Sequence, residues 1–366
     1  MKAQILSQLA TLHDNPAPLR LVDLPDPTPG PGEVLLRVLA CGVCHTELDE
    51  IEGRTPPALP MILGHQVVGQ VIGLGAGAGR FPLGQRVGVA WIFSACGHCP
   101  ACLAGAENLC PDFRAAGRDA PGGYAELMAV PEAFAYPIPD IFSDVEAAPL
   151  LCAGAVGYRS LRLANLADGR PLGLTGFGGS GHQVLLLARR LYPRSPVYVF
   201  ARSPETRAFA LELGAAWAGD TGDTPPQPPA AIIDTTPAWK PVVEALRVLA
   251  PGGRLVINAI GKEEGDKAEL LRLDYPRHLW LEKEIKSVAN VARRDVAEFL
   301  ALAAQTAIKP EVEVYPFAAA NRALFELKTQ RVRGAKVLRI SHEGGPGPVV
   351  GNPPAEARTG GWKPTG

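Results

Sequence analysis

The segment Pro171–Leu191, PLGLTGFGGSGHQVLLLARRL, decides the fold of the second half of the chain. The apolar run Pro171–Thr175 predicts a buried strand, and Gly181–Leu191 predicts a helix. The turn between them follows the pattern G-x-G-x-x-G and contains Gly176, Gly178, Gly179 and Gly181. Glycines there permit a tight bend and a close backbone approach to a pyrophosphate at the helix N-terminus. We therefore predict a dinucleotide-binding loop, the alternative being a glycine-rich surface loop.

Strand and helix signals alternate on the C-terminal side of this turn. Ser203 followed by Pro204 is typical of a helix N-cap with proline at the first helical position, and Gly214 ends that helix. A further helix is predicted at Pro241–Leu249, and strands are predicted at Val197–Ala201, Ala230–Asp234 and Arg254–Ile260. This alternation indicates an α/β fold with a parallel, doubly wound sheet of the Rossmann type.

The end of the second predicted strand bears on the choice of coenzyme. In dinucleotide folds an acidic residue about 20 residues beyond the loop binds the ribose hydroxyls of NAD. Ala201 stands at this place, and Arg202 and Ser203 follow with a cation and a hydroxyl that suit a 2′-phosphate. The sequence thus favours NADP, with NAD as the alternative if Arg202 is only solvated.

The composition excludes several classes of protein. A chain of 366 residues exceeds the usual size of a single core, so we expect two domains. Its 36 Lys+Arg and 37 Asp+Glu are scattered and leave a net charge of −1, which argues against nucleic acid and membrane as partners. The first residues, MKAQILSQLATLHD, lack the apolar region of a signal peptide. We expect a cytoplasmic protein.

Changes in the sequence pattern along the chain suggest where its domains divide. Short apolar runs at Glu33–Ala40 and Gln66–Ile72 predict many short strands in the first 150 residues or so. An amphipathic helix and strand-like segments follow Val291, up to Ile340. The remaining Gly/Pro-rich sequence predicts a disordered tail. The boundaries that we predict are 1–153 for a catalytic domain with a metal lobe at about 94–113, 154–291 for the dinucleotide domain, 292–341 for a return to the first domain, and 342–366 for the tail.

Four cysteines are spaced C-x2-C-x2-C-x7-C within CGHCPACLAGAENLC, at Cys96, Cys99, Cys102 and Cys110. Cytosolic thiols are kept reduced, and thiols this close together commonly bind metal. Four thiolates complete the shell of a zinc ion, which predicts a structural zinc. An iron–sulfur cluster and a chance cluster of free thiols are the alternatives. We expect His98, inside the loop, to be solvated.

Three other possible ligands stand apart in the sequence: Cys44, His65 and Cys152. Each alone is weak evidence, because a single Cys is usually a small apolar residue. Two thiolates and one imidazole together would hold zinc with an open fourth position, which is the arrangement of a catalytic site.

The segments CGVCHTELD, ILGHQVVGQVIGLG, CGHCPACLAGAENLC and PLLCAGAVGYRSL together resemble the medium-chain zinc alcohol dehydrogenase family. The similarity runs from the N-terminus to about Ile340. It implies a GroES-like, mainly β catalytic domain beside the Rossmann domain. It also implies two zincs per chain, with Cys44, His65 and Cys152 as catalytic ligands and the four-cysteine lobe as the structural site. Cys41 is then a core thiol.

The resemblance also assigns roles around the catalytic zinc. By this resemblance, the hydroxyl of Thr46 hydrogen-bonds the reacting oxygen of the substrate and begins proton export. His45 takes the position that contacts the coenzyme pyrophosphate. Glu47 replaces the aspartate that orients the histidine ligand. Two residues depart from the pattern: Gln66 stands where a transient carboxylate partner of zinc is usual, and Asp49 where the proton relay usually ends in histidine.

The implied substrate is a primary or secondary alcohol, or the corresponding aldehyde. By analogy, Ile51, Trp91 and Val156 line its pocket, although Trp91 can equally be a core aromatic. Gln183, Asp234 and Arg333 are further candidates on the coenzyme side. Family members are usually homodimers or homotetramers. A zinc-free quinone or enoyl reductase of the same fold and a non-catalytic zinc-binding module remain the alternatives.

Overall fold

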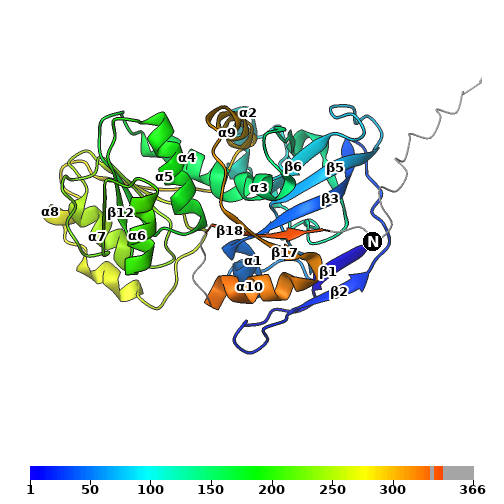
Figure 1. The fold of residues 1–366 in the computed structure, drawn as a ribbon, viewed down its shortest axis with the longest axis horizontal. Helices are drawn as coiled ribbons and strands as arrows, with labels where there is room; N and C mark the ends of the chain where they lie inside the picture. Colours follow the sequence, from blue (N-terminus) through cyan, green and yellow to red (C-terminus); the bar gives the residue numbers. More distant parts are fainter. Residues whose placement is uncertain (330–333, 341–366) are drawn as a thin grey trace, which may run out of the picture.

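The structure, a computed structural model, describes residues 1–329 and 334–340. The predicted tail from 342 and the candidate Arg333 lie outside the described residues. Two bodies lie side by side (Figure 1), one built around the parallel sheet of the middle of the chain and one containing strands from both ends. Among the described residues, no helix has both the length and the apolar character needed to cross a membrane.

The first body contains a six-stranded, fully parallel sheet. Its order is β13 (Trp217–Gly219), β12 (Val197–Phe200), β11 (Leu172–Thr175), β14 (Ala231–Asp234), β15 (Arg254–Ile257) and β16 (Glu284–Ser287). Strand order reverses beside β11, because β12 and β13 lie on one side of it and β14 to β16 on the other. Parallel sheets bind ligands at such a reversal, outside the carboxyl ends of the strands.

Both faces of this sheet are buried. Successive residues of β12 alternate between two apolar cores: Val199 packs into one and Tyr198 into the other. The helices around the sheet are α4 (Ala155–Ala164), α5 (Gly179–Leu191), α6 (Pro204–Glu212), α7 (Lys240–Val248) and α8 (Tyr275–His278). The doubly wound α/β fold is therefore confirmed. The hydroxyl of Ser203 accepts the N–H of Thr206 at 3.1 Å, as the predicted cap requires, whereas α5 begins at Gly179 rather than at Gly181.

The second body is built on a seven-stranded mixed sheet whose central strand is β3 (Glu33–Val43). The strand path runs β10 (Ala135–Pro137), β6 (Arg86–Val89), β5 (Val67–Leu74), β3, β18 (Ala335–Arg339) and β17 (Val312–Pro316), with β9 (Leu127–Pro131) also paired to β3. Smaller sheets join β2 (Leu19–Asp23), β1 (Lys2–Leu6) and β4 (Met61–Ile62), and β7 (Ile92–Ser94) with β8 (Arg114–Ala115). Because β18 pairs with β3, the chain returns to its first domain after completing the parallel sheet.

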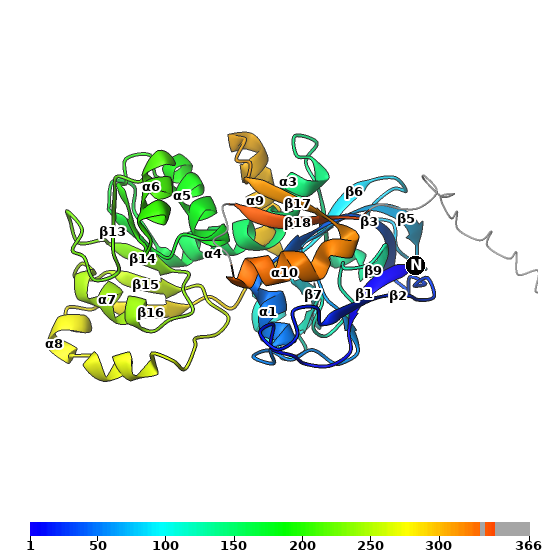
Figure 2. The ribbon, with the colours of Figure 1, turned by 60° about the horizontal axis from the view of Figure 1, so that its bottom comes forward.

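The helices of this body are α1 (His45–Ile51), α2 (Pro100–Leu103), α3 (Asp144–Pro149), α9 (Arg293–Thr306) and α10 (Ala320–Thr329). Figure 2 shows α10 beside β17 and β18, which it contacts. The prediction of only strand-like segments between α9 and Ile340 was wrong for α10. The buried residues of this helix are Ala320, Ala323, Leu324 and Leu327, which follow helical spacing.

The glycine loop between β11 and α5 depends on two close backbone approaches. Gly176 has a φ of 78°, and a Cβ added to it would lie 2.8 Å from the Thr235 hydroxyl oxygen. A Cβ at Gly181 would lie 2.8 Å from the carbonyl oxygen of Gly176, whereas a Cβ at Gly178 would meet nothing within 4 Å. The loop therefore needs glycine at Gly181 for packing but not at Gly178.

We predict that Gly181→Ala lowers the free energy of unfolding by about 1–3 kcal/mol, because the new methyl group forces the loop away from the helix. The matched variant Gly178→Ala should change it by less than about 0.5 kcal/mol. Denaturant unfolding without coenzyme measures both. Equal stabilities for the two variants would contradict this account of the loop.

Candidate metal and coenzyme site

Three side chains that are distant in sequence converge at the start of α1. Cys44 is the N-cap of α1, His65 lies between β4 and β5, and Cys152 lies in the π-helical turn η3 (Leu150–Gly154). Their ligand atoms lie within 4.8 Å of one another. His65 and Cys152 are buried, and Cys44 is half-buried. The predicted residues are thus brought together in a group of metal-ligating size.

The carboxylate of Glu47 orients this group. One oxygen accepts the backbone N–H of Cys44 at 2.8 Å, and the other lies 2.6 Å from Nδ1 of His65. With Nδ1 bound to Glu47, Nε2 of His65 is left buried with no hydrogen-bond partner in the described part of the chain. An imidazole oriented in this way, with its remaining nitrogen near two sulfurs, forms a donor set that suits zinc.

The electrostatics of the site reflect its burial. Burial raises the pKa of Glu47 above its ordinary value, with the neighbouring His65 opposing the shift. Burial by itself would lower the pKa of His65, but the Glu47 carboxylate and Cys44 raise it well above its usual range. The neighbouring Cys152 thiol, and then the adjacent His65 ring, hold the pKa of the Cys44 thiol well below its usual range, while Cys44 and burial raise the pKa of Cys152. Cys44 is therefore the sulfur that loses its proton more readily.

The other residues predicted around the metal occupy different environments. Thr46 is buried with its hydroxyl oxygen 3.7 Å from the Cys44 sulfur, and Gln66 is buried behind the His65 turn. His45 is exposed. Asp49 accepts Nε of Arg54 at 2.5 Å; burial raises the pKa of this carboxyl, and Arg54 opposes the shift.

Sequence reasoning missed Glu50, which lies three residues after Glu47 and is fully buried. Neither of its carboxylate oxygens has a hydrogen-bond partner in the described structure. Burial and the charge of Glu47 raise the pKa of Glu50 well above its ordinary value. The i, i+3 spacing of the two glutamates predicts that both lie on one face of α1, but the sequence of this seven-residue helix does not show that the face points inward.

The four cysteines of the predicted lobe also converge, with their sulfurs within 4.8 Å of one another. The backbone N–H of Cys96 donates to the sulfur of Cys110 at 3.4 Å, and the backbone N–H of Cys99 donates to the sulfur of Cys96 at 3.3 Å. Such donors favour thiolates, and those of His98 and Cys99 lower the pKa of Cys96 to about 6. The His98 ring is exposed and lies 2.9 Å from the Cys96 carbonyl oxygen. The cluster is thus a four-sulfur donor set without His98.

The glycine loop faces the reversal between β11 and β14, where Thr235 follows β14. At the end of β12, Ala201 is buried and Arg202 is exposed. The hydroxyl of Ser203 caps α6 and also donates to Glu205 at 2.8 Å. Asp234 is buried and bonded to Thr175 and Lys262, so its charge is satisfied within the protein.

The three predicted pocket residues are all buried. Trp91 packs against Phe113 with ring centroids 5.2 Å apart, and its Nε1 is buried with no partner among the described residues. Val156 is largely buried, four residues beyond Cys152. Ile51 is completely buried in the core of the second body and has no free surface. The pocket stays a prediction for all three.

Comparison with known proteins gives a consistent family. Residues 30–140 match the alcohol dehydrogenase GroES-like domain. A probable alcohol dehydrogenase, AdhA, of Mycobacterium tuberculosis is 44% identical over 329 residues, which are 88% of this chain and 93% of that protein. An alcohol dehydrogenase of Geobacillus stearothermophilus is 31% identical over 93% of this chain and 100% of its own length.

Solved structures agree with these relatives. A Sorghum bicolor cinnamyl alcohol dehydrogenase has a TM-score of 0.80 at 28% identity, covering 92% of this chain and 97% of that one. A cobalt- and zinc-bound thermostable alcohol dehydrogenase of Pyrobaculum aerophilum has a TM-score of 0.82 at 26% identity, covering 93% and 99%. With its GroES-like domain, its Rossmann sheet and these relatives, the chain belongs to the medium-chain alcohol dehydrogenase family.

Proposed function

We propose that this oxidoreductase of alcohols and aldehydes depends on zinc and on a nicotinamide dinucleotide, with NADP preferred to NAD. The carrying observation is the convergence of Cys44, His65 and Cys152 with Nε2 of His65 left free by Glu47. Two sulfurs and one imidazole leave a fourth position for substrate, which is a primary or secondary alcohol or its carbonyl product. Zinc held there would supply a Lewis acid that makes an alcohol easier to deprotonate.

The chain's own residues would position the substrate and take up its proton. The hydroxyl of Thr46, which lies beside the Cys44 sulfur, would accept a hydrogen bond from the alcohol. Asp49, near the protein surface at the same helix, would end the proton path, since its side chain is only partly buried. Trp91 and Val156 would form apolar walls that exclude water.

On the coenzyme side, the pyrophosphate would lie against the glycine loop of Gly176–Gly181, at the N-terminus of α5. Arg202 is exposed beyond the end of β12, and the ion pairs found among the described residues do not include it. It is thus available to a 2′-phosphate, whereas Ser203 already caps α6. His45, exposed beside Cys44, would contact the pyrophosphate from the catalytic domain.

The remaining predictions complete the proposal. The lobe would hold a second, structural zinc through its four sulfurs, and the domains would divide at the predicted boundaries. A homodimer or homotetramer in the cytoplasm stays the expected form. The edge strand β16 supports self-association, because Ile285 on it and the nearby Trp280 and Tyr275 are 46%, 55% and 61% exposed.

The two alternatives account for less of the structure. A zinc-free quinone or enoyl reductase has no use for an oriented Cys–His–Cys group. A non-catalytic zinc-binding module uses the lobe but leaves the glycine loop and its parallel sheet without a role. Metal content separates the three proposals, with about two zincs expected for the dehydrogenase, none for the reductase and one for the module.

We predict that purified protein contains about two zincs per chain and that Cys44→Ser loses one of them together with benzyl alcohol oxidation. The removed thiolate is both a ligand and one of the two charges that offset the metal. Cys41→Ala, which changes a core thiol outside the group, should retain both metals. Metal analysis and coenzyme reduction at 340 nm measure the outcome. Two zincs and full turnover in Cys44→Ser would refute the catalytic site.

For the coenzyme, Arg202→Ala should lower kcat/KM for NADP by about ten- to a hundredfold, because a charged hydrogen bond to phosphate contributes about 1.5–3 kcal/mol. Turnover with NAD should change little. Arg190→Ala, an exposed arginine at the far end of α5, is the control for charge. Initial rates with each coenzyme measure kcat/KM for wild type and both variants. The NADP assignment fails if wild type prefers NAD and Arg202→Ala leaves kcat/KM for both coenzymes unchanged.

The relay gives a prediction about pH. Asp49 must be deprotonated to accept a proton, so the rate should fall as pH falls through its raised pKa. Asp49→Asn should lower kcat near neutral pH and remove this acid limb. Arg54→Ala removes the partner that lowers the pKa of Asp49, so it should move the limb to higher pH. Identical pH–rate profiles for wild type and Asp49→Asn would rule out the relay.

A further inference from the structure

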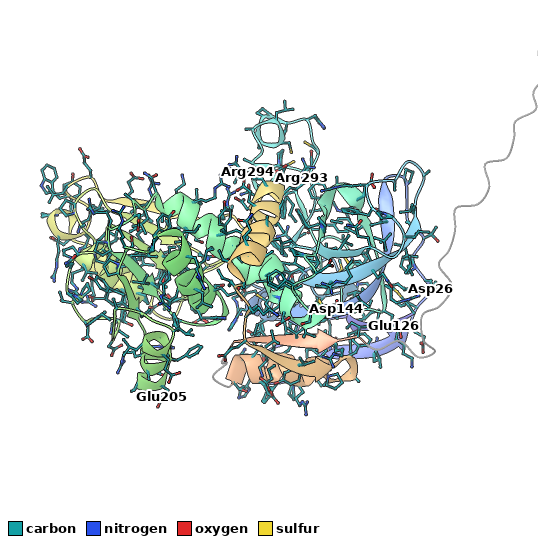
Figure 3. All side chains as sticks on the ribbon, turned by 45° about the horizontal axis from the view of Figure 1, so that its top comes forward. Asp26, Glu126, Asp144, Glu205, Arg293 and Arg294 are labelled. Atoms are coloured by element: carbon teal, nitrogen blue, oxygen red, sulfur yellow. The ribbon has the colours of Figure 1, made fainter. Side chains whose placement is uncertain are left out.

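The four-cysteine lobe touches the connection between the two bodies. We call residues 288–295 the return segment, because they lead from the edge strand β16 of the parallel sheet into α9 and back to the first domain. Figure 1 shows α2 of the lobe next to α9, and Figure 3 shows Arg293 at the end of α9 that faces the lobe. The lobe thus lies against the place where the coenzyme domain ends.

Two neighbouring residues of the lobe bind this segment. The Glu107 carboxylate accepts a hydrogen bond from Nε of Arg293 at 2.8 Å. The side-chain amide of Asn108 donates a hydrogen bond to the carbonyl oxygen of Ala289 at 2.8 Å. The Glu107 side chain is only 6% exposed, so this ion pair is shielded from water on the lobe side. The Arg293 guanidinium also lies 5.1 Å from the ring of Phe134 in the first domain.

The return segment is in turn tied to the catalytic group. Asp295, fully buried in the first turn of α9, accepts hydrogen bonds from Arg159 at 2.5 Å and Arg162 at 2.6 Å. Both arginines belong to α4, which begins directly after the π-helical turn that carries Cys152. Polar contacts, most of them part-buried, therefore link the lobe to the return segment and the return segment to α4, whose backbone continues from the Cys152 turn.

The lobe has little apolar material to hold its own shape. Leu103 and Leu109, the large apolar residues of the segment Cys96–Cys110, are 76% and 59% exposed. Glu107 and Asn108 lie in the short helix η1 (Glu107–Leu109), between Cys102 and Cys110. A small unit without a core depends on its metal for structure. The position of Glu107 and Asn108 thus follows from the four-sulfur cluster.

We propose that Glu107 and Asn108 form a latch through which the lobe metal sets the position of the coenzyme domain. The inference rests on the proposed function, because it needs a metal in the lobe and a coenzyme in the crevice. With the latch intact, the edge of the parallel sheet stays at a fixed place relative to Cys152. Without the latch, the return segment loses two contacts. Part of the free energy of coenzyme binding is then used to order this segment, so the coenzyme binds less tightly.

The test compares the double variant Glu107→Gln/Asn108→Ala with Asp112→Asn, which removes an exposed carboxylate from the same lobe. We expect both proteins to keep their full metal content. The Kd for reduced coenzyme, measured by nicotinamide fluorescence, should rise about tenfold in the latch variant and stay unchanged in the control. Backbone amides of residues 288–292 should exchange hydrogen faster in the latch variant alone. A Kd and exchange rates equal to those of Asp112→Asn would overturn the proposal.

A second arm tests the role of the metal. Cys99→Ser, which weakens the lobe site, should raise the coenzyme Kd in the otherwise native chain but add nothing to the latch variant. Independent, additive increases would overturn the latch as the route of coupling. If Cys99→Ser does not fold, the first comparison still decides. If wild type binds no coenzyme, the proposed function fails, and hydrogen exchange at 288–292 alone then supports or overturns the latch.

Discussion

The arrangement of Cys44, His65 and Cys152 depends on the buried carboxylate of Glu47. It accepts the N–H that begins α1 and lies against Nδ1 of His65, so one side chain fixes the helix that carries Cys44 and the orientation of the histidine. A hydrogen bond to a charged group contributes about 1.5–3 kcal/mol, and its loss in a buried place leaves the other partner unsatisfied. Glutamate reaches both partners here from the third position of the helix, through the capping-box geometry.

Chain topology brings Cys152 to Cys44 and His65 and places the glycine loop in the adjoining body. Cys152 lies where the chain leaves the first domain, and β18 pairs with β3 after the parallel sheet is complete. Insertion of the coenzyme domain between these points places the glycine loop and the Cys–His–Cys group on adjacent parts of one molecule. The ion pairs of the fully buried Asp295 with Arg159 and Arg162 hold the exit and the return together. Removing one partner of such a buried pair costs more than the pair itself contributes, because the other charge stays buried.

The sequence predicted what local chemistry determines. The glycine loop, the Ser203 cap, the strands around them and the spacing of the lobe cysteines each carry a short-range signal, and the structure has them in those places. The grouping of Cys44, His65 and Cys152 needed the family resemblance, because 87 residues separate the last two. The helix α10 was missed although Ala320, Ala323, Leu324 and Leu327 follow helical spacing, since its polar residues and short length weaken the signal. Glu50, Arg54 and the contacts of Glu107 depend on tertiary packing, which no local pattern encodes.

The two cysteine groups show how donor number and burial divide their roles. The lobe offers four sulfurs in exposed surroundings, so a metal bound there would have no open position for substrate. The free energy of metal binding would instead stabilise the short helix that contains Glu107. The group at Cys44 offers three donors in a buried place and needs an external ligand to complete it. Both groups contact the passage between the domains, one through Cys152 at the exit and the other through Arg293 at the return. In the proposed enzyme, metal bound at either place would therefore stabilise the relative position of the two bodies, so that the open site faces the proposed coenzyme loop.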